Sequence, residues 1–475
     1  MINQSHTDTI VAPATIPGTG AISIVRISGP DSFKIVDAVV KLTGGTISAA
    51  EGYTIHFGSV MVEGSLLDEV LVSVFRAPHS YTGEDSVEIS THASSYIVRE
   101  VTRLLLAAGA RLAEPGEFTR RAFLNGKMDL AQAEAVADVI SSTTSASHRV
   151  AMHQLKGSYS RELAGLRSEL LEMASLLELE LDFSEEDVEF AGRDQLLALL
   201  ERTKTHVDAL AASFHQGNLI KNGVPVAIVG PANAGKSTLL NALVGEDRAI
   251  VTDIPGTTRD TLEECITLGG VQFRFIDTAG LRESEDTVEH LGIERSYKAL
   301  SGAEIVLLVL DGTEKEDALK EQISAVTDRL DFSFQKLFIL LNKTDLEAKI
   351  GVNKNVSKIN TFVSHIISKA VIISLSAKQQ TGLEELKNAL IKVEKDLVST
   401  ASASFVTNVR HFEALQNASS ALAACRTSLT RGTPSDLVAE DLRLALREIN
   451  AILGTDLLDP DVILHSIFSK HCIGK

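Results

Sequence analysis

The segment Gly230–Ser237, with the sequence GPANAGKS, matches the pattern G-x-x-x-x-G-K-[ST] of a phosphate-binding loop. An apolar run, Val224–Val229, precedes it and a helical segment, Thr238–Val244, follows it, which is the context in which such a loop works. Glycines let backbone N–H groups surround phosphates at a helix N-terminus, while Lys236 neutralises the β- and γ-phosphates and the Ser237 hydroxyl ligates Mg²⁺. The sequence therefore predicts a nucleoside triphosphate site.

Three later motifs indicate which nucleotide binds. Asp277–Gly280 (DTAG) places a carboxylate near the Mg²⁺ and a glycine near the γ-phosphate, and Ser376–Lys378 can lie behind the base. In Asn342–Asp345 (NKTD), the carboxylate of Asp345 can accept hydrogen bonds from both guanine N1–H and the exocyclic amine, which adenine does not offer together. All three follow predicted strands, at the edge where doubly wound sheets bind ligands. We therefore expect GTP.

The candidates for catalysis of GTP hydrolysis lie in two further segments. In Gly256–Asp260 (GTTRD), we expect Thr258 to complete the Mg²⁺ shell and order a switch loop. Leu281 follows Gly280 where Ras-like proteins have a glutamine that orients water, and an apolar side chain cannot do this. Either hydrolysis is slow or another polar group acts, the candidates being Arg282, Glu283, Glu285, Asp286 and Glu289.

Composition bounds the class of protein. The 475 residues are 44% hydrophobic and 23% charged, which predicts two or three globular domains. The net charge of −18 argues against a protein that coats nucleic acid by bulk electrostatics. Three distant cysteines make a disulfide framework or a zinc ribbon improbable and favour a reducing cytoplasm. We expect neither a signal peptide nor a membrane-spanning segment.

One segment is locally basic. Arg99–Lys127 contains six Lys or Arg residues against three Glu. A basic segment can bind nucleic acid, but on charge alone ordinary surface charge is the preferred interpretation.

The hydrophobic pattern divides the chain into four zones. Short β-branched runs up to about residue 118 indicate an α+β part, with strands expected at Ala21–Ile27, Glu69–Phe75 and Ser86–Ile89. A helical pattern follows to about 215, and another begins after about 395. Between them, five strands of a mostly parallel sheet are expected at Val224–Val229, Phe273–Ile276, Ile305–Leu310, Leu337–Leu341 and Ala370–Leu375. We interpret this as an α/β module inserted into a helical domain.

Two helical stripes are specific enough to test. The first, at spacings of three and four, consists of Leu155, Tyr159, Leu163, Leu166, Leu170, Ala174, Leu177 and Leu181. The second consists of Leu442, Ala445, Leu446, Ile449 and Leu453. Gly454 follows the second stripe where a glycine ends a helix.

Several motifs in one order resemble the MnmE (TrmE) family of tRNA-modification GTPases along the whole chain. They are TGED (82–85), PGEFTRRAFLNGKMDLAQAEAV (115–136), the GTPase motifs, and the terminal CIGK (472–475). The resemblance implies a multidomain α/β fold: an α+β N-terminal folate-binding-like domain, an all-α helical domain, and an inserted Ras-like P-loop GTPase domain with a mostly parallel sheet. The expected parts are 1–118 (folate binding and dimerisation), 119–218 (helical), 219–392 (GTPase) and 393–475 (helical, with CIGK).

The resemblance also implies an activity. The family acts with an FAD-containing partner, MnmG (GidA), to add an aminomethyl or carboxymethylaminomethyl group at C5 of the wobble uridine of certain tRNAs. The one-carbon donor is 5,10-methylenetetrahydrofolate, with a 5-formyl analogue as an alternative ligand, and the FAD belongs to the partner. A homodimer, a heterotetramer or larger complex with MnmG, and a K⁺-stimulated GTPase activated by dimerisation of the GTPase domains are expected.

Family motifs carry over to individual positions in the nucleotide site. Mg²⁺ is assigned to Ser237 and Thr258, and K⁺ to Asn233 together with Thr252, Ile254 and Thr257. The expected GTP-binding residues are Asn233, Ala234, Gly235, Lys236, Ser237, Thr238, Thr252, Asp253, Ile254, Pro255, Gly256, Thr257, Thr258, Asp277, Thr278, Ala279, Gly280, Asn342, Lys343, Asp345, Ser376, Ala377 and Lys378.

The same resemblance assigns catalytic and folate-binding roles. Glu289 matches the glutamate that orients water, and Cys472 is important for modification, either as a nucleophile or near the reactive carbon. The expected folate ligands are Arg26, Glu88, Lys127 and Lys475. Basic groups can pair with the glutamate tail of folate, and a carboxylate can accept from the pterin amine.

Two other functions compete with this one. A switch GTPase that acts as a binding module in ribosome assembly would share the nucleotide motifs, but it would be expected to add a basic RNA-binding domain, and the C-terminal zone is not strongly basic. A folate-dependent transferase with a vestigial GTPase module is disfavoured because every nucleotide motif is intact.

Overall fold

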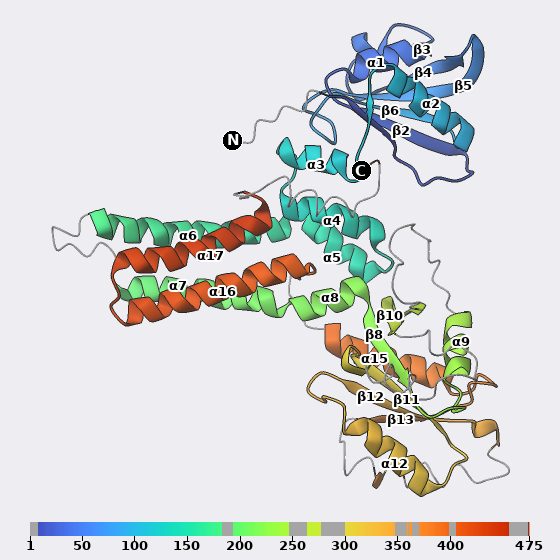
Figure 1. Ribbon diagram of the computed structural model, residues 1–475, viewed down its shortest axis with the longest axis vertical. Coiled ribbons are helices and arrows are strands. Elements are labelled where there is room, and N and C mark those ends of the chain that lie inside the picture. The colour runs from blue at the N-terminus through green and yellow to red at the C-terminus, as the bar shows by residue number, and fades with distance from the viewer. Residues whose placement is uncertain are drawn as a thin grey trace. The chain divides into compact units, whose positions relative to one another are not determined.

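The computed structural model describes residues 8–182, 193–246, 264–276, 300–346, 359, 361–362, 370–398, 405–455 and 474 (Figure 1). The chain divides into two compact units. The first comprises Met1–Ile140, Ala151–Val207 and Glu413–Lys475, and the second comprises Ser141–Val150 and Asp208–Phe412. The division passes through four continuous helices, α4 (Leu130–Ser141), α5 (Ser145–Leu155), α7 (Arg193–Ala212) and α16 (Val409–Thr430). No helix in the described ranges is long and apolar enough to cross a membrane.

An N-terminal sheet has the strand order β3-β4-β5-β6-β2-β1-β7 among the described residues. Neighbouring strands are antiparallel except β1 and β7. The strands are β1 Ile10–Pro13, β2 Ile22–Ser28, β3 Val40–Leu42, β4 Thr54–Val62, β5 Ser65–Phe75, β6 Ser86–His92 and β7 Arg111–Leu112. The three strands predicted in this region are confirmed as β2, β5 and β6.

One face of this sheet packs against helices. Along β5, Val70, Val72 and Val74 alternate inward and join a core with Val101 and Leu105 of α2 (Ser95–Ala107). Helix α1 (Ser32–Val39) contributes to the same core. The period of two therefore leaves the other face of the sheet without this cover.

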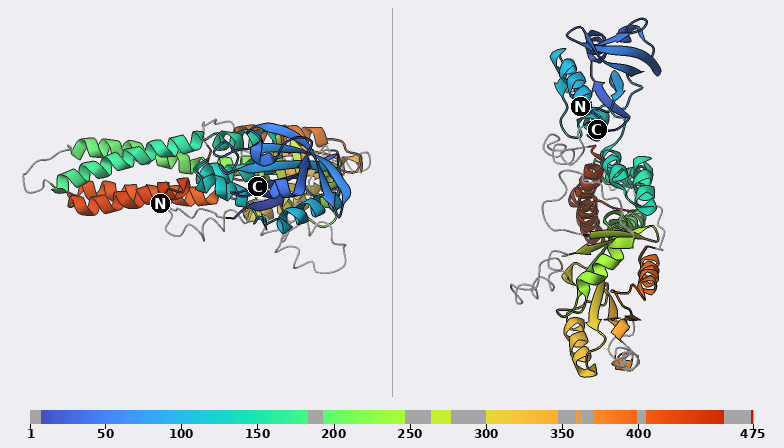
Figure 2. Two further views of the ribbon diagram at one scale, coloured as in Figure 1. Left: turned by 90° about the horizontal axis from the view of Figure 1, so that it is seen from above. Right: turned by 90° about the vertical axis from the view of Figure 1, so that its right-hand side faces the viewer.

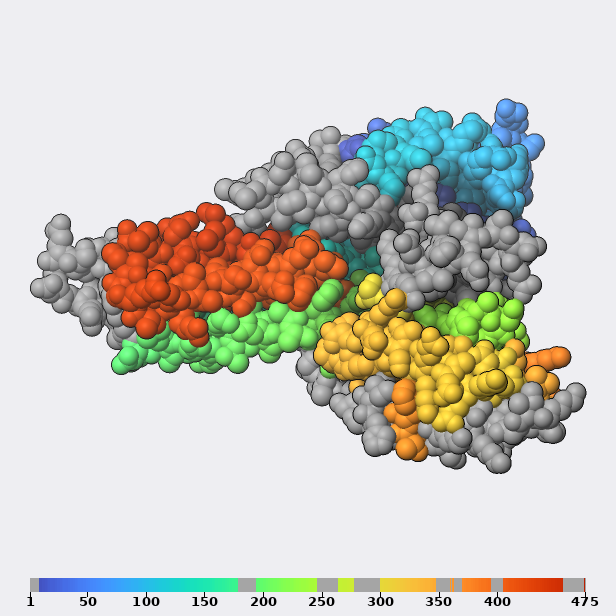
Figure 3. Space-filling model, turned by 60° about the horizontal axis from the view of Figure 1, so that its bottom comes forward, coloured from blue at the N-terminus to red at the C-terminus, as the bar shows by residue number. Residues whose placement is uncertain are grey.

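Helices α6 (Ser158–Asp182), α7, α16 (Val409–Thr430) and α17 (Ser435–Leu453) pack side by side; α17 and α6 run together in Figures 1 and 2, and Figure 3 shows α16 and α17 against α7. In the first stripe, Tyr159, Leu163, Leu166, Leu170 and Leu177 are buried, although Met173 takes the place expected for Ala174. The side chain of Leu181 lies outside the described ones.

The second stripe and its cap are confirmed. Leu442, Ala445, Ile449 and Leu453 are buried in α17. Gly454 follows with φ of 77° and ψ of 23°, the left-handed conformation that ends a helix without strain in glycine. A Cβ there would lie 2.9 Å from Phe123.

A second sheet, in the GTPase part, has the strand order β13-β12-β11-β8-β10-β9 among the described residues. It is parallel except for the β9–β10 pair. The strands are β8 Val224–Val229, β9 Glu264–Leu268, β10 Val271–Ile276, β11 Ile305–Asp311, β12 Lys336–Asn342 and β13 Val371–Ser374. All five predicted strands are confirmed.

Helices cover both faces of this sheet. Alternate strand residues enter two separate cores, one with α9 (Lys236–Glu246) and α15 (Leu383–Val398), the other with α12 (Glu316–Thr327). Burial on both faces explains why the strands read as continuous apolar runs. The doubly wound GTPase fold expected from the sequence is confirmed.

The chain passes twice between the helical part and the GTPase part, and the two connecting segments contact each other. Ser213 Oγ accepts a hydrogen bond from Val406 N at 3.1 Å, and the rings of Phe214 and Phe412 stack with centroids 4.5 Å apart. This fits an inserted module. The boundaries expected at 118/119, 218/219 and 392/393 fall inside the helices α3 (Glu117–Leu124), α8 (Phe214–Asn222) and α15, and the four-part division stays a prediction.

Candidate functional site

The phosphate-binding loop connects β8 to α9. Its residues Gly230, Asn233 and Gly235 have positive φ angles of 145°, 59° and 98°. A Cβ on Gly230 would lie 2.1 Å from the carbonyl oxygen of Val309 in β11. Only glycine fits this close approach, which lets the backbone turn from the strand into the helix.

Lys236 reaches back over the loop. Its Nζ donates hydrogen bonds to the carbonyl oxygens of Gly230 at 2.9 Å and Pro231 at 2.7 Å. Burial lowers the pKa of Lys236. The neighbouring Ser237 and Thr238, in the first turn of α9, are exposed. The loop thus presents an ammonium and a hydroxyl at a helix N-terminus, as phosphate binding requires.

Asn342 joins three of the predicted motifs. The buried side chain donates from Nδ2 to the carbonyl oxygen of Ala234 at 2.8 Å and accepts at Oδ1 from the backbone N–H of Ala377 at 2.9 Å. A Cβ on Gly235 would lie 2.2 Å from Nδ2 of Asn342. The glycine therefore permits the approach, and Asn342 fixes the phosphate loop relative to the base-binding loops.

Asp345 is oriented by the last motif. Its Oδ1 accepts a hydrogen bond from the buried hydroxyl of Ser376 at 2.6 Å, and this hydroxyl accepts from Gln379 N at 3.2 Å. Lys378 is exposed beside them. In the described part of the chain, Oδ2 of Asp345 accepts no hydrogen bond, so an acceptor is held at the edge where a guanine N–H can reach it.

Sequence reasoning missed Asp311 and Thr313. Lys343 has a φ of 68°, and its Nζ donates to Oδ2 of Asp311 at 2.6 Å. Oδ1 of Asp311 accepts from Thr313 N at 3.0 Å and Thr313 Oγ1 at 2.6 Å. Burial alone would raise the pKa of Asp311, but the hydrogen bonds from Lys343 and Thr313 lower it overall. The sequence feature that could have identified Asp311 is its position directly after the apolar run Ile305–Leu310.

Several predicted site residues lie outside the described ones. These are Thr252 to Thr258, Asp277 to Gly280, Leu281, Arg282, Glu283, Glu285, Asp286, Glu289, Cys472 and Lys475. Strand β10 ends at Ile276, directly before Asp277, and pairs in parallel with β8. Its carboxyl end therefore lies at the same edge as the phosphate loop.

The structure brings two of the expected folate ligands together. Arg26 and Glu88 lie opposite each other on β2 and β6. Nε and Nη2 of Arg26 lie 2.9 and 2.7 Å from Oε1 of Glu88. The guanidinium also lies 5.3 Å from the centroid of the Tyr81 ring, and Nη1 donates to the carbonyl oxygen of Gly474 at 3.3 Å. The described residue of the CIGK motif thus meets this pair.

Lys127 makes a different contact. Its Nζ donates to the carbonyl oxygen of Pro78 at 2.9 Å, and its stem would lie 3.3 Å from a Cβ on Gly83. Across the described ranges, no hydrogen bond or ion pair joins Lys127 to Arg26 or Glu88. Three of the four expected ligands are described, and two of them are in contact.

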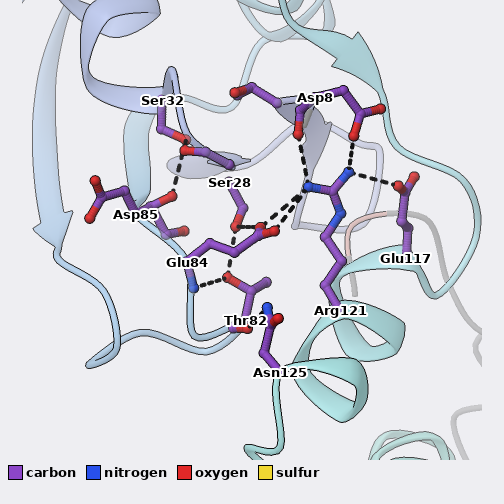
Figure 4. A network of polar contacts seen from close by, with 12 residues as sticks. Asp8, Ser28, Ser32, Thr82, Glu84, Asp85, Glu117, Arg121 and Asn125 are labelled. Carbon is purple, nitrogen blue, oxygen red and sulfur yellow. Dashed lines mark hydrogen bonds and ion pairs between the residues drawn. The ribbon is translucent and has the colours of Figure 1, made fainter. Parts of the chain in front are cut away.

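The motifs TGED and PGEFTRRAF form a buried ion network (Figure 4). Arg121 is fully buried and donates to carboxylate oxygens of Asp8 at 2.8 Å, Glu84 at 3.2 Å and Glu117 at 3.0 Å. Burial would raise the pKa of Glu117, but hydrogen bonds from Arg111, Glu114 N and Arg121 lower it overall. Part of the basic segment is therefore internal and paired, which corrects the expectation of ordinary surface charge.

The face of the N-terminal sheet that lacks the helix cover carries exposed apolar side chains on β4 and β5, with Ser73 of β5 lying opposite Glu88. Phe57 and Leu71, opposite each other on β4 and β5, are 51% and 49% exposed, and Ile55 is 68% exposed. Leu71 in turn lies opposite Ser90 of β6. Since side chains two apart share a face, these residues lie on the same face as Glu88. We call this the outer sheet face: Ile22, Arg26, Ile55, Phe57, Leu71 and Glu88.

Comparison with known proteins covers the whole chain. The family model of the MnmE helical domain matches residues 130–472, and that of the GTP-binding protein TrmE N-terminus matches residues 9–127. A curated relative from Flavobacterium johnsoniae is 46% identical, covering 100% of both chains, and one from Bacteroides fragilis is 47% identical, covering 98% of this chain and 99% of its own. Both are named tRNA modification GTPase MnmE.

Two solved structures are similar to part of this chain. The FeoB G-domain from Methanococcus jannaschii is 26% identical, covering 36% of this chain and 98% of its own, with a TM-score of 0.26. A GTP-binding protein from Sulfolobus solfataricus in complex with GDP is 21% identical, covering 49% and 67%, with a TM-score of 0.28. The two family models and the full-length relatives show that the chain belongs to the MnmE family.

Proposed function

We propose that this chain hydrolyses GTP to drive the modification of wobble uridine in certain tRNAs at C5. The observation that carries the proposal is the nucleotide edge: Asn342 bonds to the phosphate loop at Ala234, Ser376 orients Asp345, and Lys236 bonds to the carbonyl oxygen of Gly230. Its setting is a chain similar along its entire length to proteins named tRNA modification GTPases. The added group is aminomethyl or carboxymethylaminomethyl, and the FAD-containing partner MnmG takes part in a heterotetramer or larger complex.

In the GTPase step, each residue has a stated task. Asp345 accepts from the guanine edge, and Lys236 moves from its loop carbonyls to the β- and γ-phosphates. The exposed hydroxyl of Ser237, with Thr258, suits Mg²⁺, which prefers oxygen ligands and neutralises phosphate charge. Glu289 orients the attacking water and takes its proton.

A monovalent cation completes the charge balance in this proposal. Asn233, whose side chain is exposed on the phosphate loop, would hold K⁺ together with Thr252, Ile254 and Thr257. A K⁺ held by these residues would supply the positive charge that an arginine finger supplies in other GTPases. We expect this arrangement when two GTPase domains meet.

The outer sheet face is the proposed one-carbon site. Arg26, Glu88, Lys127 and Lys475 would hold 5,10-methylenetetrahydrofolate or a 5-formyl analogue. The donor set fits, because Oε1 of Glu88 accepts both bonds from Arg26 and, within the described residues, Oε2 accepts none. Oε2 can therefore accept from a pterin amine. Cys472 precedes Gly474 by two residues and is the proposed thiol for the modification step.

Dimerisation would cover the same face. Ile55, Phe57 and Leu71 are 68%, 51% and 49% exposed on the same face of the sheet as the Arg26–Glu88 pair. Exposed apolar side chains in one patch mark interaction sites, and a symmetric homodimer is the commonest occupant. We propose that a second copy packs there and closes the one-carbon site.

The test is mass spectrometry of tRNA nucleosides from cells that lack the protein and from complemented cells. The proposal expects loss of C5-aminomethyl-type wobble uridines and their return with the intact gene. An unchanged nucleoside profile would overturn it and favour a switch GTPase that acts in ribosome assembly. Complementation with Asp345→Asn separates the GTPase requirement from the mere presence of the protein.

A further inference from the structure

Helix α5 and its flanks carry cations in a stretch without acids. No Asp or Glu occurs between Asp138 and Glu162, although the chain has 63 acidic residues and a net charge of −18. The stretch contains Arg149, Lys156 and Arg161. A run of this length without a carboxylate leaves a local positive charge in an acidic protein.

Helix geometry gathers these cations on one side. Arg149, His153 and Lys156 are spaced by four and three residues, so they form a stripe along α5. Arg149 and Lys156 are exposed. The buried residues of the helix, Ser147, Ala151 and Gln154, lie on the opposite side. The stripe therefore faces away from the packed side of its own helix.

A third exposed cation is held at the end of the stripe. Nη1 of Arg161 donates to the carbonyl oxygen of Lys156 at 3.2 Å, and Nη2 donates to Ser158 Oγ at 3.0 Å. The tight turn at Gly157, with φ of 74°, lets α6 begin beside the end of α5. These contacts use a carbonyl and a hydroxyl, so they leave the positive charge of Arg161 unbalanced.

None of these cations has a carboxylate partner in the part of the chain that the structure describes. The arginines of the N-terminal network differ: Arg111 and Arg121 each contact two or more carboxylates. Unpaired cations on one side produce a positive potential that attracts polyanions, whereas paired ones do not. The charge is therefore available to a partner.

We propose that Arg149, His153, Lys156 and Arg161, the α5 basic stripe, dock the phosphate backbone of tRNA. This rests on the proposed function, in which tRNA is the substrate. From Arg149 to Lys156 the helix rises about 10 Å, which matches roughly three phosphates of one strand. Phosphate contacts position a nucleic acid without reading its sequence, which suits an enzyme that accepts several tRNAs.

The charge pattern favours RNA over a protein partner. The stripe is cationic along its length, and the apolar side chain between its members, Met152, is half-buried. Protein interfaces have an apolar or aromatic centre, which the stripe lacks. An acidic protein surface is the competing occupant, and the test separates the two.

The experiment uses the full-length protein with the double variant Arg149→Gln/Lys156→Gln. The matched control is Arg99→Gln/Arg103→Gln, which removes two exposed cations of α2 that lie beside Glu100. Affinity for unmodified tRNA is measured by filter binding at several KCl concentrations, with GTP hydrolysis in the absence of tRNA as a check on folding. Arg161 is kept because it also caps α5.

The proposal expects the affinity to fall about 10-fold, with the slope of log K against log salt smaller by between 1 and 2, since each phosphate contact contributes about 0.7 to 0.9. GTP hydrolysis and the control variant stay at the wild-type level. Unchanged tRNA affinity and slope would overturn the proposal. So would reduced binding of MnmG with unchanged tRNA binding, which would make the stripe a protein-docking surface. If the wild-type protein alone binds no tRNA, this inference fails, whereas the proposed function is overturned only by an unchanged nucleoside profile.

Discussion

The nucleotide edge and the outer sheet face hold their functional side chains in different ways. At the nucleotide edge, Asn342 bonds to the loops on both sides of it, and Ser376 fixes Asp345. At the outer sheet face, Arg26 and Glu88 bond to each other, while Phe57 on the same face is 51% exposed. The nucleotide site is braced by hydrogen bonds between loops of its own domain, whereas the largely buried Arg26–Glu88 pair shares its sheet face with exposed apolar side chains.

This difference indicates how each site becomes functional. The base-binding groups are arranged by hydrogen bonds within one domain, so GTP affinity should not depend on a second copy of the chain. The Arg26–Glu88 pair shares its sheet face with exposed apolar side chains of β4 and β5 that a partner can cover. We therefore expect the outer sheet face, and not nucleotide binding, to depend on dimerisation.

The largest expected effect is on the rate of GTP hydrolysis, as distinct from the affinity for GTP. Glu289→Ala should lower GTP turnover by about 10²- to 10⁴-fold, the usual contribution of a positioned proton acceptor. GTP affinity should barely change, because binding uses other residues. Single-turnover hydrolysis and fluorescent-nucleotide titration measure the two quantities. Glu285→Ala is the control and should hydrolyse normally; loss of GTP binding by Glu289→Ala would count against the assigned role.

Base selection is the next largest effect. Asp345→Asn replaces one acceptor with an amide donor, which matches the carbonyl of xanthine in place of the guanine amine. We expect GTP affinity to fall about 100-fold, since hydrogen bonds to a charged group contribute about 1.5 to 3 kcal/mol each, and xanthosine triphosphate to bind better. Competition titration compares the two nucleotides. An unchanged preference for guanine would refute the assignment, and folate binding serves as the internal control.

Phe57→Asp should break the dimer while sparing the nucleotide edge. A charge in place of an exposed aromatic side chain at an interface should raise the dimer dissociation constant by about 30-fold or more. Analytical ultracentrifugation measures the association, and the GTP affinity of the variant should stay at the wild-type value. Leu437→Asp, at an apolar residue of α17 that is 57% exposed, is the control. A Phe57→Asp protein that remains dimeric would place the interface elsewhere.

The smallest expected effect concerns the hydrogen bonds by which Asn342 connects the phosphate loop to the base-binding loops. Asn342→Ala removes two hydrogen bonds and leaves the N–H of Ala377 and the carbonyl of Ala234 without their partner. We expect GTP affinity to fall about 10-fold through loss of loop order. The exposed Gln379→Ala should have no effect in the same titration. If Asn342→Ala binds GTP normally, the bracing does not support binding.

Sequence patterns predicted the GTPase sheet better than the N-terminal one. Strands buried on both faces, such as β11, read as continuous apolar runs. Strand β9 was missed because it alternates, and β4 because Ile55 and Phe57 on its outer side are exposed. The residue type of an apolar side chain does not show whether it lies on an exposed sheet face or in a core, so the sequence pattern alone cannot distinguish the two.

Contacts between distant segments explain the other differences. A count of charges does not distinguish Arg111 from Arg121. Arg121 is nevertheless fully buried, where it pairs with Asp8 and Glu84, which are distant from it in the sequence. The sequence likewise does not show that Asp311 is a partner of Lys343. The two residues meet because the parallel strands β11 and β12 end at the same edge of the sheet. Motif spacing located the nucleotide site, but only tertiary packing shows which side chains hold it in place.

The most direct test of the account couples base selection to tRNA chemistry. Wild-type protein and the Asp345→Asn variant are each combined with MnmG, tRNA and the one-carbon donor, and supplied with either GTP or xanthosine triphosphate. Mass spectrometry then measures C5-modified wobble uridine. We expect modification by the wild type with GTP and by the variant with xanthosine triphosphate. Equal modification by the variant with either nucleotide, or with none, would contradict the claim that nucleotide hydrolysis at this site drives the reaction.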